Sequence, residues 1–212
     1  MFYRLRTYQL RPRAVAEAER RFAAACQRRC ELSPLAAAFR TEIGPLNRVL
    51  HFWPCRSPDE GARIDAAAAA AGVWPPPLAD LLVEDHCELF GALAFSPEIR
   101  PGEVGPYFEM RTYLCRPKEL EKMIAIWELA LPQRLAFGPL AAALVADVGD
   151  LRRFVHLWPY RSLDERQRQR ERMRAAGVWP PPLVARSLGL PNFELEHQES
   201  MLLVSSLYSP LR

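Results

Sequence analysis

The 212-residue sequence has no long apolar run, few cysteines and almost no lysine. Its longest apolar stretch, the alanine-rich segment 66–73, is far shorter than the roughly 18 residues that a transmembrane helix needs. The first thirteen residues include four arginines, which excludes a secretory signal. We therefore expect a cytoplasmic protein with no membrane partner.

The five cysteines are odd in number and scattered, so we interpret them as reduced thiols rather than as a disulfide framework. The sequence also lacks a Gly-rich phosphate loop, a Gly-x-Ser-x-Gly elbow and a Cys-x-x-Cys pair, and we expect no cofactor. Glu84, His86 and Glu88 alternate along a predicted strand and would suit a divalent ion beside His51. A polar sheet edge explains them better, and we expect no metal.

Positive charge comes almost entirely from arginine, with 26 Arg against 2 Lys and a net charge of +3. Carboxylates lie between the arginines along the chain, so the sequence shows no clustered basic face of the kind that binds nucleic acid. Half of the residues are apolar, which excludes disorder and is enough for a sizeable core.

The chain repeats itself at an offset of 105 residues. The matching segments are 3–12 with 108–117, 46–60 with 151–165, and AGVWPPPL at 71–78 with the same letters at 176–183. Across 3–78 no gap is needed, and 32 of the 76 positions are identical. We expect a first unit at 1–97, a Pro- and Gly-rich linker at 98–106, and a second unit at 107–212.

Each unit shows the same order of elements. In the first unit we predict a strand at 2–10, a helix at 13–30 and a hairpin of strands at 35–43 and 48–55. A second helix, opened by the capping box of Ser57 and Glu60, and a last strand near 84–94 follow. In the second unit the last strand is predicted at 195–207. This β-α-β-β-α-β order is a ferredoxin-like unit, an α+β fold with both helices on one sheet face. Two such units would cover each other's bare faces, sheet to sheet.

The opening motif Y-x-L-R-T-Y-x-L-R-P and the motif T-E-I-G-P-L-N-R-V-x-H-x-W-P at 41–54 closely resemble the NIPSNAP family. The resemblance covers nearly the whole chain as two tandem copies. It implies a dimeric α/β-barrel formed by the two halves of one chain. That superfamily includes cofactor-independent monooxygenases and isomerases, whereas NIPSNAP members have no established reaction and animal members are regarded as scaffolds.

Strand alternation divides the polar from the apolar positions. We expect Tyr3, Leu5 and Thr7, with Phe108, Met110 and Thr112, to lie under the helices. The opposite faces would then turn Arg, Tyr, His and Trp side chains into the barrel lumen. These candidate ligand-binding residues are Arg6, Tyr8, His51 and Trp53 and their copies Arg111, Tyr113, His156 and Trp158.

Three functions remain open for this arrangement. Arg and aromatic side chains suit a small anionic or aromatic ligand in the lumen, which is our first hypothesis. In the second, His51 or His156 is the general base of a cofactor-independent enzyme of the monooxygenase or isomerase type. In the third, the lumen is only packed and the chain is a scaffold, which leaves a homodimer possible.

A buried arginine in the lumen needs an acceptor. For Arg6 and Arg111 the sequence offers Glu42, Asp147, a Tyr hydroxyl or a bound anion. Each unit also carries a Trp-Pro-Pro-Pro segment, whose tryptophan we interpret as an anchor that holds the loop on the barrel.

Overall fold

The computed structural model describes all 212 residues as five helices and eight strands. The first half consists of β1 (Phe2–Leu10), α1 (Val15–Cys30), β2 (Ala37–Ile43), β3 (Arg48–Cys55), α2 (Pro58–Ala70) and β4 (Leu82–Ala92). The second consists of β5 (Tyr107–Cys115), α3 (Leu120–Leu135), β6 (Ala142–Ala146), β7 (Arg153–Tyr160), α4 (Leu163–Ala175), α5 (Pro181–Ser187) and β8 (Leu195–Ser205). None of the helices is both long and apolar enough to span a membrane.

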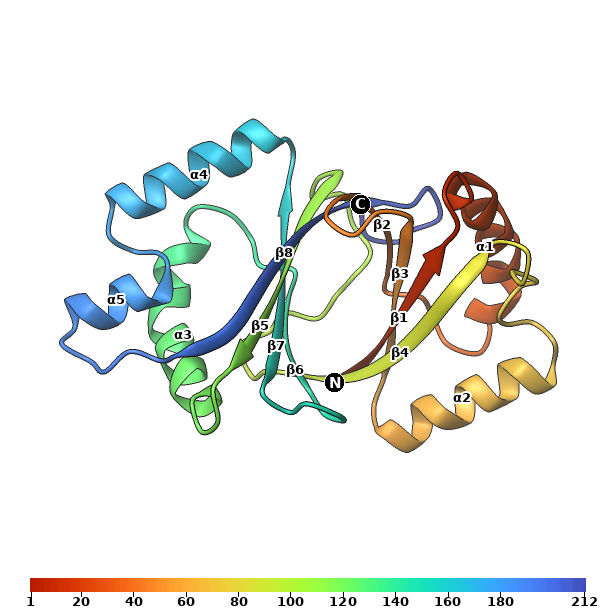
Figure 1. The fold of residues 1–212 in the computed structure, drawn as a ribbon, viewed down its shortest axis with the longest axis horizontal. Helices are drawn as coiled ribbons and strands as arrows, with labels where there is room; N and C mark the ends of the chain where they lie inside the picture. The colour runs from red at the N-terminus through yellow and green to blue at the C-terminus, as the bar shows by residue number, and fades with distance from the viewer.

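The eight strands close into one antiparallel ring in the order β1-β3-β2-β8-β5-β7-β6-β4. Within each half the strands pair as the ferredoxin-like order requires, and the pairs β2–β8 and β4–β6 join the halves. The helices of each half cover the outside of its own sheet, at opposite ends of the molecule (Figure 1). The predicted α+β architecture, two βαββαβ units forming a dimeric α/β-barrel, is confirmed.

Local sequence signals place the connections. Ser57 caps α2 by accepting a hydrogen bond from the backbone N–H of Glu60 at 3.2 Å, and Ser162 caps α4 in the same way. The β2–β3 turn needs left-handed backbone at Gly44 (φ +118°) and Asn47 (φ +59°), residue types that adopt it at low cost. The short helix α5 was not predicted from the sequence. It begins in the prolines of the second Trp-Pro-Pro-Pro segment, where proline fits the first helical turn.

The barrel interior is apolar and comes from both halves. Its core cluster is built of residues such as Tyr3, Leu5, Phe39, Leu50, Phe52, Phe108, Met110, Leu157 and Leu203. The predicted orientation of the strand faces is therefore wrong, because the more apolar set lies in the lumen. On the helix side, residues of α2 such as Asp65 can neutralise the strand arginines, which favours that side for them.

The segment at the end of each half packs on the other half. The aromatic-Ser-Pro segment that follows β4 lies on the second half, where the Ser96 hydroxyl accepts a hydrogen bond from the Ala143 N–H at 2.9 Å. The matching segment after β8 lies on the first half, where Ser209 accepts from the Ala38 N–H at 2.9 Å. Each half thus contributes a serine that binds a backbone N–H of β6 or β2 in the other half.

We predict that a 1–97 fragment will not be a stable monomer. Alone it would expose the lumen face with Leu5, Leu50 and Phe52, an apolar area large enough to drive association. Size-exclusion chromatography with light scattering should show dimers or aggregates. A monodisperse monomer with dispersed amide resonances would contradict the shared core.

Candidate functional site

The eight candidate residues lie on the helix side, in two separate groups. In the first half Tyr8 packs on Phe22 of α1 with ring centroids 4.7 Å apart, and Trp53 packs on Trp74 at 5.3 Å. The second half repeats this with Tyr113, His156 and Trp158 beneath α3 and Trp179. The predicted convergence within each half occurs, but the predicted location in the lumen is wrong.

The lumen itself holds only a small cavity of about 170 Å³. Six of its twelve lining residues are apolar, and the other six are Thr7, Thr112, Arg48, Arg153, Glu88 and Glu199. Arg153 forms an ion pair with Glu88. Thr7 and Thr112 face it from the two halves. The barrel interior therefore offers far less room than the helix side described below.

Both core histidines are buried completely. Burial, reinforced by the positive charge of Arg6, lowers the pKa of His51 to about 3. Its Nε2 lies 2.6 Å from the hydroxyl of Tyr208, which arrives on the exchanged C-terminal segment. Burial and the charges of Arg111 and Arg134 likewise lower the pKa of His156, so both rings are neutral at physiological pH.

The environment of His156 differs from that of its counterpart. Phe95 occupies the place in its exchanged segment that Tyr208 has in the other, and it has no hydroxyl to offer. His156 instead accepts a hydrogen bond at Nδ1 from the Trp158 indole N–H at 2.7 Å. Neither histidine lines any of the larger pockets of the molecule.

On the helix side of the first half, arginines are neutralised by carboxylates of the same half. Asp65 of α2 forms an ion pair with Arg4 at 2.8 Å and accepts a hydrogen bond from Arg29 at 3.3 Å. Asp85 of β4 lies 3.7 Å from Arg6. Arg6 therefore pairs with neither of the acceptors expected from the sequence, Glu42 and Asp147. Burial opposes its charge, but Tyr8 and the nearby acidic groups raise the pKa of Arg6 overall.

The same positions in the second half have reversed or lost these charges. Arg4 is replaced by Glu109, and Asp65 is replaced by Arg170. Glu109 is held by two hydrogen bonds from Arg166, at 2.6 and 3.0 Å, and the nearest approach of Arg170 to it is 3.9 Å. Although burial opposes ionisation, the contacts with Arg166 keep the pKa of Glu109 below its usual value.

Gln198 stands where the first half has Asp85. The strand register fixes this equivalence, because Gln198 pairs with Tyr113 as Asp85 pairs with Tyr8. Arg111, the copy of Arg6, has no carboxylate within 4 Å, whereas the Nε atoms of both arginines are buried without a hydrogen-bond partner. A further cation, Arg174, replaces Ala69.

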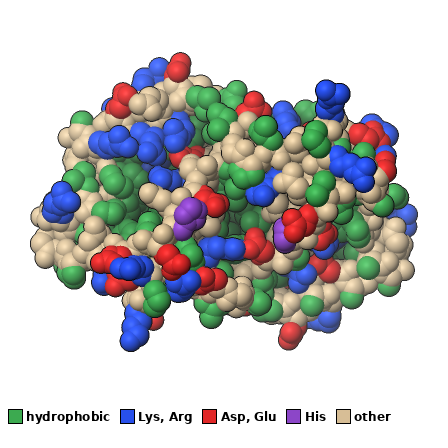
Figure 2. Space-filling view, viewed as in Figure 1, with side chains coloured by type: hydrophobic (Ala, Val, Ile, Leu, Met, Phe, Trp, Pro, Cys, Tyr) green, Lys and Arg blue, Asp and Glu red, His purple; other side chains and the backbone are tan.

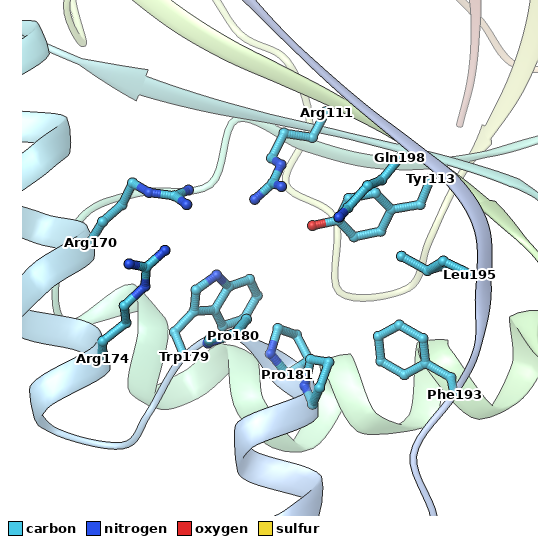
Figure 3. Close-up of a pocket in the computed structure, with 11 residues that line it drawn as sticks. Arg111, Tyr113, Arg170, Arg174, Trp179, Pro180, Pro181, Phe193, Leu195 and Gln198 are labelled. Carbon is cyan, nitrogen blue, oxygen red and sulfur yellow. The ribbon is translucent and has the colours of Figure 1, made fainter.

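These changes surround a pocket with a volume of about 430 Å³. Arg111, Arg170 and Arg174 reach into it from β5 and α4 and point toward one another (Figure 3). The rest of the lining is Tyr113, Trp179, Pro180, Pro181, Pro182, Phe193, Leu195 and Gln198. On the molecular surface, Lys and Arg side chains gather over α4 beside a hollow that exposes hydrophobic side chains (Figure 2).

This arrangement can hold an anion attached to an apolar body. Guanidinium groups donate paired hydrogen bonds to carboxylate or phosphate oxygens. Burial raises the pKa of Tyr113, so its hydroxyl, which points into the pocket, remains a hydrogen-bond donor at neutral pH (Figure 3). Trp179 and Phe193 supply aromatic surface for the remainder of a ligand.

Of the eight residues predicted from the sequence, only Arg111 and Tyr113 line this pocket. Trp158 and His156 lie behind it in the core of the second half. Arg170, Arg174 and Phe193 were not predicted from the sequence. A signal for the two arginines was present in α4, which contains five arginines where α2 contains one, Arg63.

The tryptophans of the repeated Trp-Pro-Pro-Pro segments are anchors, as the sequence indicated. Trp74 and Trp179 are 3% and 9% exposed, and each packs on the tryptophan of the preceding strand. Buried arginines stack on those strand tryptophans: the Arg29 guanidinium lies 4.2 Å from the Trp53 ring centre, and Arg134 lies 4.0 Å from Trp158.

The family model of NIPSNAP matches residues 3–97 and, again, residues 108–210. The chain belongs to the NIPSNAP family. The Drosophila melanogaster protein NipSnap is 23% identical to it over 192 residues, which cover 84% of this chain and 69% of the fly protein. A NipSnap homolog of Dictyostelium discoideum is 33% identical over 72 residues, and the match spans only 32% of that protein.

Solved structures with little sequence similarity share the complete two-unit fold of this NIPSNAP protein. A candidate monooxygenase of Fusobacterium nucleatum aligns with a TM-score of 0.69 at 6% identity, over 97% of this chain and 92% of its own. An anthrone oxidase-like protein aligns with a TM-score of 0.62 at 10% identity, over 96% and 90%. At these identities the likeness shows the fold alone.

The two buried histidines predict a pH-dependent stability. Their pKa values in the folded state lie below the unfolded value of about 6.5, so below pH 6.5 the unfolded chain takes up protons that the folded chain does not. The stability gained from neutral histidine is complete above pH 6.5 and is lost as the pH falls, by up to about 1.4 kcal/mol per pH unit for each ring.

Urea unfolding of the wild type, His51→Gln and His197→Gln at pH 7.5 and 5.0 measures this effect. The free energy of unfolding should fall less between the two pH values in His51→Gln than in the wild type. The exposed His197 provides the matched control for the loss of a histidine at the surface. An identical fall in all three proteins would contradict the assignment to His51.

Proposed function

We propose that this NIPSNAP protein binds one small organic anion with an aromatic or aliphatic body in the helix-side pocket of its second half. The observation that supports this most directly is the convergence of Arg111, Arg170 and Arg174 on one pocket. The one carboxylate within 4 Å of them, Glu109, lies 3.9 Å from Arg170 and is already held by Arg166. Arg111 and Arg170 are half-buried and Arg174 is exposed, and a bound anion would offset the cost of holding these charges together.

The comparison between the halves strengthens the proposal. The same fold on the first side satisfies its arginines internally, through Asp65 and Asp85. The second side has Arg170 and Gln198 at those positions, and the carboxylate that it gains, Glu109, is engaged by Arg166. The excess of positive charge on the second side is therefore not a requirement of the barrel. The aromatic and proline lining then indicates a ligand that is more than an inorganic ion.

The general-base role considered for His51 and His156 is not part of this proposal. A general base must come within hydrogen-bond reach of the proton it removes, directly or through one water. Both rings are enclosed by aromatic side chains and line no pocket of substantial size. Binding is therefore the function for which the geometry gives support.

We expect organic anions to raise the melting temperature of the wild type in a screen of benzoate, phenylacetate and phenyl phosphate, with benzamide as the neutral comparison. A ligand at a hundredfold excess over its Kd stabilises the folded state by about 2.7 kcal/mol. Arg111→Met should abolish the shift. Arg6→Met, the same change in the first half, is the matched control and should keep it.

Three outcomes of that screen would contradict the proposal. If no anion shifts the wild-type midpoint, the pocket does not bind this class of ligand. If the shifts survive in Arg111→Met, the site lies elsewhere. If Arg6→Met loses them instead, the ligand occupies the first half.

Arg111→Met should also leave the unliganded protein at least as stable as the wild type. The substitution removes a guanidinium whose Nε is buried without a hydrogen-bond partner and reduces the repulsion among three clustered cations, at the loss of its contact with the Tyr113 ring. Arg6→Met removes the partner of Asp85 and should be neutral or mildly destabilising. Urea denaturation measures both, and a large loss of stability in Arg111→Met would show that this arginine has a structural role.

A further inference from the structure

The charges that differ between the two halves also indicate what kind of anion the pocket accepts. This step rests on the proposed function and concerns the charge of the ligand's head group. In the first half two carboxylates, Asp65 and Asp85, face the arginines from α2 and β4. Their counterparts in the second half are Arg170 and Gln198, so two built-in negative charges are missing there.

Other carboxylates of the second half do not neutralise the three pocket arginines. Glu109 is the one carboxylate within 4 Å of any of the three pocket arginines, and it is already engaged by Arg166 and by the Ser200 hydroxyl at 2.8 Å. Burial lowers the pKa of Arg170, and Arg166, Arg111 and Arg174 lower it further against the opposing effect of Glu109. Its neighbours are thus mainly other cations.

The position of Gln198 locates the missing charge. On the first side the Asp85 carboxylate lies 3.7 Å from Arg6, and Gln198 occupies the same register position opposite Tyr113. Its side chain lies near Tyr113 and Arg111 at the rim of the pocket (Figure 3). A neutral amide there lets an external anion approach Arg111, whereas a carboxylate would occupy the guanidinium itself.

We propose that the pocket selects a doubly charged head group, such as the phosphate of a monoester with an aromatic or apolar alcohol, over a singly charged one. Gln198 is the residue that sets this preference by not supplying an internal carboxylate. A phosphate monoester presents three strong acceptor oxygens to the converging arginines and carries two negative charges above its second pKa, near 6. The site is single, because the first half neutralises its own arginines.

Phenyl phosphate and phenyl sulfate test the charge preference, since they share a ring and a tetrahedral head and differ in charge. In isothermal titration calorimetry at pH 8.0 we expect phenyl phosphate to bind the full-length protein about tenfold more tightly or better, with one site per chain. At pH 5.0, where the phosphate is mainly singly charged, the ratio of the two affinities should shrink.

The variants Gln198→Asp and Gln198→Asn test the role of this residue, because they are nearly equal in size and differ in charge. Gln198→Asp should bind phenyl phosphate at least about tenfold more weakly than Gln198→Asn at pH 8.0. Circular dichroism of both variants verifies that the fold is retained, which the exposure of this side chain favours.

The possible failures are distinguishable. Equal affinity for phosphate and sulfate would overturn the preference for two charges and leave the proposed binding function standing. Equal binding by the two Gln198 variants would overturn the role of this residue. Absence of binding by either phenyl ester, together with no response to any carboxylate, would remove the proposed function and this inference with it.

Discussion

Closure of the eight-stranded ring is the constraint on which the rest of the molecule depends. Neither half can bury the inner face of its own sheet, so each needs the other, and the core of the shared interior is apolar. Arg48, Arg153, Glu88 and Glu199 line the lumen cavity, where Arg153 and Glu88 form an ion pair, and the repeated Arg, Tyr, His and Trp residues lie on the outer face. There, helices and sheet rims can provide counter-ions, cation–π partners or access to solvent.

The sequence was sufficient for the architecture because the two copies align without a gap through both helices and three strands. Turn and capping residues such as Asn47, Ser57 and Ser162 then placed the connections. It was not sufficient to predict which face of each strand points into the lumen. Both faces are buried, and alternation separates them without saying which one lies inside. Tyr8 and Trp53 are as compatible with a helix cover as with a second sheet.

The candidate site was predictable only in part for a related reason. Arg111 and Tyr113 stood out because they are repeated, and repetition marks only the positions at which the two halves agree. The residues that distinguish the pocket are those where the halves differ, among them Arg170 and Gln198. The role of these residues depends on contacts between different elements, such as the ion pair of Asp65 with Arg4. The alternation pattern of a single strand does not predict such contacts.

The exchange of the aromatic-Ser-Pro segments shows how completely the halves are related by a pseudo-twofold axis. In a homodimer of one such unit, every substitution would appear on both sides, and a cluster of uncompensated arginines would weaken the assembly twice. Joining the units in one chain removes that restriction. One side can keep its internal ion pairs and contribute rigidity, while its twin gives up the same pairs to become a receptor. Covalent fusion thus permits a division of labour that symmetry would forbid.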